Sequence, residues 1–298
     1  MGTSYFVQQI VNGFILGSMY ALVALGFSLI YGIIRLINFA HGDVVMIGAF
    51  VTLGLMQLAG VPFIVTMLAV LAVCALVGIL IERATFRPMR GAPQVTGFIA
   101  SLAISIMIQN IGIMILTAQP RNFFFPEYLQ QVINLGDVSF RAVDVMIVGS
   151  ALVLMIILLF IVKKTRLGIA MRATAENLDV ARLMGININR TILAAFAIGS
   201  SLAGIAGLMW GGKFGQIDPL LGYVPGLKSF VAAVIGGVGS IPGAIAGGLI
   251  LGLAEVLFVG LLPPVYSAYR DAFVFSTLIV ILLILPNGLF GTSTEKRA

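Results

Sequence analysis

The chain has 298 residues, of which 60% are hydrophobic and 9% are charged, with a mean hydropathy of +1.13 and a formal net charge of +6. Soluble domains carry about 25% charged residues, so this composition excludes a soluble protein and makes lipid the solvent for most of the chain. The single cysteine, Cys74, excludes a disulfide within the chain and identifies no redox compartment.

Apolar stretches close to the length of a transmembrane helix, about 20 residues, follow one another along the chain. The first is too long, and lacks the basic start, for a cleaved signal peptide, so we expect it to belong to the fold. The predicted fold class is all-α: a polytopic membrane helix bundle with about nine transmembrane helices, eight to ten being compatible, in one domain over residues 1–298. The predicted spans are 6–34, 44–59, 61–81, 95–118, 143–162, 191–212, 226–240, 243–262 and 272–290.

The basic residues divide unevenly between the two sides of this arrangement. One side collects Arg35, the basic residues of 83–90, the segment 163–190, and Lys296 with Arg297. Because basic residues accumulate in cytoplasmic loops, we expect 83–94 and 163–190 in the cytoplasm with the C-terminus beside them, and the loop 119–141 outside. The consecutive aromatic residues of that loop are then expected at the membrane interface: Phe123, Phe124 and Phe125.

The segment 172–184, "RATAENLDVARLM", reads as a short amphipathic helix closed by Gly185. Helical spacing puts Leu178 and Ala181 on one face, with Glu176, Asp179 and Arg182 nearly opposite. A helix lying along lipid headgroups is the alternative, but such anchors usually combine Trp or Phe with a basic polar face. Small residues opposite acidic ones favour a helix that docks in a groove of a partner protein.

Two ionisable residues stand out in apolar surroundings. His41, in "NFAHGD", is the only histidine, too few ligands for a metal site, so structural hydrogen bonding, gating or solute passage, and proton coupling stay open. Glu255 lies inside an apolar span, where it needs a partner or water. Pairing with Lys213, Lys228 or Arg270 and contact with a transported solute both stay open.

The chain contains 35 glycines, many at four-residue spacings such as Gly199, Ala203 and Gly207, which predict closely packed helices. The run 222–248, with "GGVGSIPG", predicts an interrupted helix. At membrane depth such breaks occur where protein or water covers the backbone, and in transporters they often flank the solute route. The candidate translocation path comprises Asn38, His41, Gly236, Gly237, Gly239 and Glu255.

Four motifs together carry a family resemblance. "DVARLMG" at 179–185 resembles the EAA-xxx-G loop of ABC importer membrane subunits, with Asp179 for the Glu, Val180 for the first Ala, and Ala181 and Gly185 matching. Its surroundings, "NFAHGD", "ERATFRPMRGAP" and "GGVGSIPGAIAGG" resemble the H-type (LivH-like) permease subunits of branched-chain amino acid importers. The likeness runs from about residue 8 to 291, and the departures at 179 and 180 are conservative.

The resemblance implies a single permease domain of an ATP-driven importer, multi-pass in the bacterial cytoplasmic (inner) membrane. It implies a second related permease subunit, forming a heterodimer, two P-loop ATPase subunits, and an extracytoplasmic amino acid binding protein. The segment 173–184 becomes the coupling helix, which ATP-driven closure of the ATPases would push. The residues expected to couple to the ATPase are Arg172, Ala173, Glu176, Asp179, Val180, Ala181, Arg182 and Gly185.

The chain has no G-x-x-x-x-G-K-[ST] phosphate loop, so we expect it not to be an enzyme. ATP and Mg²⁺ would be bound by the partner ATPases, and no cofactor, metal or nucleic acid by this chain. An ion-gradient-driven secondary amino acid transporter is the second hypothesis, and a membrane-embedded enzyme the third. Within the importer class, urea, short amides or another small solute stay open as substrates.

Overall fold

The computed structural model describes residues 3–291 and is almost entirely helical. Within these residues, eight helices are long and apolar enough to cross a membrane, which confirms a polytopic helix bundle. They are α1 (Thr3–Ile34), α2 (Ala40–Leu53) with the π turn η1 (Gly54–Leu58), α3 (Phe63–Ile81) with η2 (Glu82–Phe86), α4 (Gln94–Leu116), α6 (Ala142–Lys164), α9 (Ile188–Phe214), α11 (Ile241–Leu261), and η3 (Pro264–Tyr269) with α12 (Arg270–Ile284).

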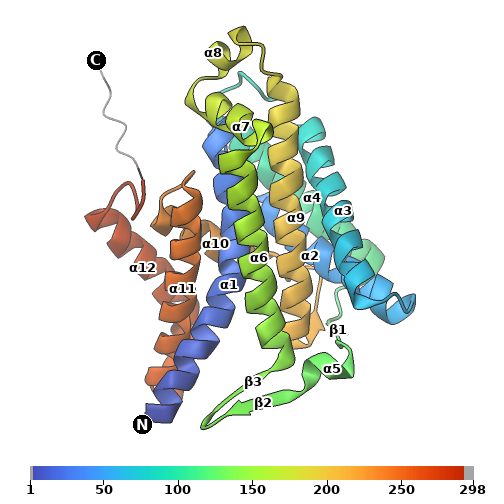
Figure 1. The fold of residues 1–298 in the computed structure, drawn as a ribbon, viewed down its shortest axis with the longest axis vertical. Helices are drawn as coiled ribbons and strands as arrows, with labels where there is room; N and C mark the ends of the chain where they lie inside the picture. Colours follow the sequence, from blue (N-terminus) through green and yellow to red (C-terminus); the bar gives the residue numbers. More distant parts are fainter. Residues whose placement is uncertain (1–2, 292–298) are drawn as a thin grey trace.

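The bundle has two distinct ends (Figure 1). The basic end, at the top of the view, carries α7 (Arg166–Glu176) and α8 (Leu178–Leu183). The hairpin end carries the start of α1, the strands β2 (Val132–Leu135) and β3 (Val138–Arg141), the short helix α5 (Glu127–Gln130), and β1 (Arg121–Asn122), which pairs antiparallel with β4 (Gln216–Ile217).

The segments 83–94 and 163–190 meet at the basic end, as the charge pattern predicts. The guanidinium of Arg90 pairs with Glu82 and donates a hydrogen bond to the side chain of Asn189, just inside α9. Lys296 and Arg297, which were assigned to the same side, lie outside the described residues.

A ninth apolar helix, shorter than the other eight, lies between α9 and α11 in the chain. α10 (Tyr223–Gly236) has 14 residues. At 1.5 Å per residue it spans about 21 Å, less than the hydrocarbon core of about 30 Å. The loop 215–222 leads back into the bundle before α10 begins, because Gly222 packs against Gly42 of α2. The predicted span 226–240 is therefore a half-helix that begins inside the bundle and ends at Gly236.

Glycine allows the central helices to pack backbone against backbone. A Cβ atom at Gly252 of α11 would lie 2.3 Å from Cα of Gly17 in α1, and one at Gly48 of α2 would lie 2.2 Å from the carbonyl oxygen of Gly204 in α9. Such contacts replace the missing hydrophobic driving force between helices in lipid. A further contact, between Gly26 of α1 and Gly199 of α9, places α1 between α9 and α11 at the centre of the bundle.

The aromatic cluster of the loop 119–141 does not face the membrane interface as a whole. Only Phe124 is exposed, at 62%, whereas Phe123 and Phe125 are 3% and 5% exposed. Both lie on a glycine pair of α9, where a Cβ at Gly212 would come within 1.6 Å of the Phe125 ring. The expected interfacial position is therefore wrong for Phe123 and Phe125, because the glycines open a groove that takes their rings.

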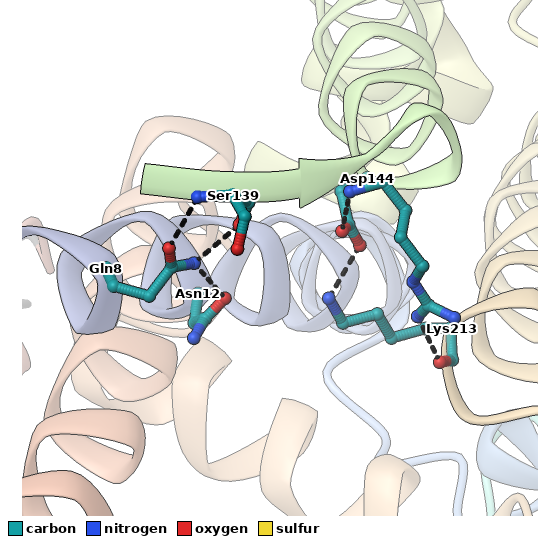
Figure 2. Close-up of polar contacts among 6 residues, drawn as sticks. Gln8, Asn12, Ser139, Asp144 and Lys213 are labelled. Atoms are coloured by element: carbon teal, nitrogen blue, oxygen red, sulfur yellow. Dashed lines mark hydrogen bonds and ion pairs between the residues drawn. The ribbon is translucent and has the colours of Figure 1, made fainter. Parts of the chain in front are cut away.

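A polar network fastens the hairpin end (Figure 2). The carboxylate of Asp144, in the first turn of α6, accepts from the backbone N–H of Arg141 at 2.9 Å and from Nζ of Lys213 in α9 at 2.6 Å. The amide of Gln8 in α1 exchanges two hydrogen bonds with the backbone of Ser139 in β3, each 2.9 Å long. Lys213 is therefore engaged here and is not a partner of Glu255.

Candidate functional site

The charged segment at the basic end forms two helices rather than the single predicted helix 172–184. Asn177 is extended (φ −155°, ψ 115°) and separates α7 from α8. Its Oδ1 accepts hydrogen bonds from the backbone N–H groups of Asp179 (2.9 Å) and Val180 (3.0 Å), which makes it the N-cap of α8. The prediction missed this break because the flanking residues favour helix and the cap competes with them only locally.

The end of the segment follows the sequence closely. Gly185 has φ +81°, the left-handed conformation that glycine supplies after a helix. The N–H of Ile186 donates to the carbonyl oxygen of Ala181 at 3.1 Å and closes the turn. The predicted closure at Gly185 is confirmed.

We call residues 177–185 the α8 tip. Ala181 is 3% exposed and packs toward the bundle, whereas Leu183 and Met184 are 86% and 78% exposed. The tip therefore presents an apolar surface away from the rest of the chain, formed by Leu178, Val180, Leu183 and Met184. The amphipathic pattern pointed to Glu176, Asp179 and Arg182 instead, and it missed Leu183 and Met184. Their signal was two consecutive large apolar residues before a helix-ending glycine.

Replacing Asn177 with alanine is expected to loosen the tip, because two N–H groups of α8 lose their acceptor. Loss of an N-cap costs about 1 kcal/mol, which is roughly a fivefold change in a local opening equilibrium. Hydrogen exchange of a peptide covering 177–185 should therefore speed up about fivefold. Asn177→Asp keeps the acceptor and should exchange like the native chain; equal exchange in Asn177→Ala would remove the capping role.

Hydrogen bonds hold α7, the helix that precedes the α8 tip, in place. The Thr165 side chain caps α7 by accepting from the N–H of Gly168 at 3.1 Å, and the Arg172 guanidinium donates to the carbonyl oxygen of Val162. Burial lowers the pKa of the nearby Arg90 guanidinium, and the negative charge of Glu82 opposes that shift. The hydrogen bonds of Thr165 and Arg172 thus fix α7 to the end of α6.

A buried ion cluster lies where α1, α10, α11 and α12 meet. Glu255 is 2% exposed, and its Oε1 pairs with Nζ of Lys228 at 2.7 Å and with Nε of Arg270 at 3.2 Å. Its other oxygen accepts from the hydroxyl of Tyr20 at 2.9 Å. Lys228, 1% exposed, also pairs with Asp271 at 2.6 Å. Of the partners considered from the sequence, Lys228 and Arg270 are the ones that Glu255 contacts.

This cluster forms part of the wall of a cavity of about 630 Å³, the hairpin-end cavity. The cavity reaches Tyr5 and Asn12 near the start of α1, and its apolar lining includes Met19 and Trp210. Glu255 is therefore both paired and beside a cavity, so the two sequence-based alternatives are compatible.

The "NFAHGD" motif lies where the chain turns back into the bundle. α1 ends at Ile34, the next residue Arg35 has a left-handed conformation (φ 52°), and α2 then begins beside Gly26 in the last third of α1. The fully buried His41 ring lies on Gly26, where a Cβ atom would be 2.3 Å from Nε2, and edge-on to Phe27 at 4.6 Å between centroids. Within residues 3–291, neither the ring nitrogens of His41 nor the amide of Asn38 have a hydrogen-bond partner.

The interrupted helix has its break between α10 and α11. Gly237 (φ +102°) and Gly239 (φ +89°) take conformations that favour glycine, and Gly236 packs directly on the backbone of Gly243. The backbone N–H groups of Leu289 and Phe290 donate to the carbonyl oxygens of Ile235 and Gly236, each at 2.9 Å. Gly239 lines a cavity of about 590 Å³, the basic-end cavity, together with Tyr31 and Arg35.

A third cavity, of about 240 Å³, lies on the other face of α10 from the hairpin-end cavity. We call it the aromatic cavity; Phe27, Phe39, Phe98 and Phe230 line it together with Asp43 and Gln109. The half-helix α10 thus touches three cavities.

The sequence-predicted path residues do not converge on one site: Glu255 lies at the hairpin end, Gly239 at the basic end, and His41 behind Phe27. Sequence reasoning did not single out Phe98 or Gln109, although an amide inside the span 95–118 was an available signal.

Comparisons with known proteins agree on one family. Residues 9–283 match the family described as branched-chain amino acid transport system, permease component. The chain is 38% identical to the high-affinity branched-chain amino acid transport system permease protein BraD of Pseudomonas aeruginosa and 39% identical to LivH of Escherichia coli K12, with 98% of each chain covered.

A more distant relative is the probable LivH permease protein of Methanocaldococcus jannaschii, which is 30% identical over 97% of this chain and 94% of its own. No solved structure matches. Near-complete coverage of both chains, the family match over residues 9–283 and the multi-pass helix bundle lead to one conclusion: the chain belongs to the branched-chain amino acid transport system permease family.

Proposed function

We propose that the chain is the membrane permease subunit of an ATP-driven importer for branched-chain amino acids, residing in the bacterial cytoplasmic membrane with its basic end in the cytoplasm. The names of its relatives supply the solute class, and the distribution of basic residues supplies the orientation. The chain itself forms the path, while ATP and Mg²⁺ are bound by two separate P-loop ATPase subunits.

The α8 tip is the observation that carries the proposal. It projects from the basic end (Figure 1), and Leu183 and Met184 are almost fully exposed there. Exposed apolar groups rimmed by polar residues mark a protein interaction site, and helices commonly dock through them into grooves. A subunit that lacks a phosphate loop but carries such a tip is suited to bind a separate ATPase there and to be moved by it.

The three cavities around α10 support a solute path through the bundle. α10 is a half-helix bounded by glycine breaks, the arrangement that transporters use around their solute sites. Movement of α10 relative to α2 and α11 would change which cavity is continuous with either side. The remaining partners in the proposal are a related second permease subunit, forming a heterodimer, and a binding protein that delivers the amino acid at the hairpin end.

Copurification tests the proposal directly. Leu183→Asp puts a charge on the most exposed apolar residue of the tip and should reduce recovery of the ATPase at least about tenfold in mild detergent, because a charge in an apolar interface is poorly tolerated. Val132→Asp is the matched control: Val132 is also a highly exposed apolar residue, 62% exposed, but lies in β2 at the opposite end. It should leave ATPase recovery unchanged.

Uptake into vesicles then separates the function classes. Leucine uptake that requires ATP and is lost in Leu183→Asp supports the importer. A chain that purifies without an ATPase yet moves leucine under an ion gradient would be a secondary transporter, and the proposal would be wrong.

A further inference from the structure

The wall of the aromatic cavity includes a buried carboxylate that has no ion-pair partner within residues 3–291. Asp43 of α2 is 2% exposed, and its Oδ1 accepts a hydrogen bond from Nε2 of Gln109 in α4 at 2.9 Å. Ser105 of α4 is a second polar neighbour of the carboxylate, whose Oδ2 is enclosed by protein and makes no hydrogen bond of normal geometry within residues 3–291. The carboxylate has no ion-pair partner among these residues. A buried carboxylate without an ion-pair partner is costly, so this site favours a ligand that brings N–H groups and positive charge.

The rest of the cavity is apolar and aromatic. Four phenylalanine rings form a connected chain: the Phe39 ring centroid lies 5.0 Å from that of Phe98 and 6.0 Å from that of Phe230, which in turn lies 5.8 Å from Phe27. Leu102 and Leu227 extend this surface. The lining suits an aliphatic side chain, and ring faces also attract a nearby ammonium group.

The third chemical feature is the start of α10. Gly222 and Tyr223 line the cavity, and no side chain caps this helix end. The helix dipole places partial positive charge there, which favours a carboxylate. Gly42 and Gly226 hold α2 and α10 in backbone contact, because a Cβ at Gly226 would lie 2.7 Å from Cα of Gly42. The carboxylate of Asp43 and the start of α10 are thereby fixed on the walls of one cavity of about 240 Å³.

We propose that the aromatic cavity is the site where this subunit holds the amino acid during passage. Asp43 binds the α-ammonium group, the ring chain receives the branched side chain, and the start of α10 faces the carboxylate. The inference rests on the proposed function for the solute class. The hairpin-end cavity is the weaker alternative, because its buried carboxylate, Glu255, is already neutralised by Lys228 and Arg270.

Thiol protection tests this site on the full permease–ATPase complex without the binding protein. Leu102→Cys places a thiol on the cavity wall, and methyl methanethiosulfonate is the reagent. Leucine should slow the reaction. 3-Methylbutylamine, which keeps the ammonium and the branched chain, should protect at concentrations within a few-fold of leucine. 4-Methylpentanoate, which lacks the ammonium, should need at least about tenfold more, because it cannot satisfy Asp43.

Two controls accompany the experiment. The native chain contains only Cys74, which is fully buried and should give no reaction. Val132→Cys, in β2 outside the membrane spans, is 62% exposed and lies outside the lining of the cavity, so it should react without being protected. Asp43→Asn in the Leu102→Cys chain should raise the leucine concentration needed for half protection at least about tenfold.

Each outcome decides the matter. Equal protection by leucine and 4-methylpentanoate, no protection by leucine, or an unreactive thiol at residue 102 would overturn the inference. Should Asp43→Asn fail to assemble, the solute series on Leu102→Cys alone still decides it. If the native complex takes up leucine with ATP while the thiol is unprotected, only this inference fails; if no ATPase copurifies with the native chain, the proposed function fails.

Discussion

Replacing Lys228 with methionine is expected to destabilise the subunit by about 3–5 kcal/mol, the usual effect of removing one partner from a buried ion pair. Methionine approximates the shape of lysine, so the loss is mainly that of the positive charge. Glu255 would keep the Tyr20 hydroxyl and Arg270, but the Arg270 side chain is 50% exposed and 3.2 Å away, which makes it a weaker partner. A buried carboxylate would then be under-compensated.

The apparent melting midpoint in detergent, followed by fluorescence-detected size exclusion, measures this effect. A drop of roughly 5–15 °C is expected for a chain of this size. Lys228→Met combined with Glu255→Gln should recover most of the loss, since neither charge remains. Lys213→Met is the control, because it breaks a pair whose lysine side chain is 21% exposed, and its effect should be smaller. A double variant as unstable as the single one would rule out this account of the cluster.

Replacing Gly207 with alanine is expected to prevent normal packing of α2 against α9. A Cβ atom at this position would lie 1.9 Å from the carbonyl oxygen of Val45 and 3.0 Å from the backbone nitrogen of Ala49. Both neighbours are helix backbone, which cannot rotate away as a flexible side chain could. The cost should reach or exceed the ~1–3 kcal/mol typical of overpacking.

Gly149→Ala gives the matched comparison within the bundle. Gly149 lies inside α6, and a Cβ atom there meets nothing within 4 Å, so alanine's better helix propensity should leave the subunit unchanged or slightly more stable. The yield of monodisperse protein and its melting midpoint should therefore fall for Gly207→Ala and hold for Gly149→Ala. Equal behaviour of the two variants would show that α2 and α9 can separate without cost.

The sequence by itself determined most of the membrane-spanning helices and which basic segments share one end of the bundle, because helix formation is local and the charge pattern follows the chain. A long apolar segment satisfies its backbone hydrogen bonds within itself in lipid, so composition and length predict each span. Gly185 ends its helix through its own conformational freedom, and the basic segments 83–94 and 163–190 share one end of the bundle. The four motifs also identified the family that the comparisons show.

Only the tertiary structure decided which side chains meet. Lys213, Lys228 and Arg270 were equivalent partners for Glu255 in the sequence, and neighbouring helices assigned Lys213 to Asp144 instead. Phe123 and Phe125 are buried because a glycine pair of α9 happens to face them. The aromatic cavity needs α1, α2, α4 and α10 at one point, and no local pattern brings Asp43 and Phe98 together. Such contacts depend on long-range packing, which pairs surfaces by shape and charge rather than by order along the chain.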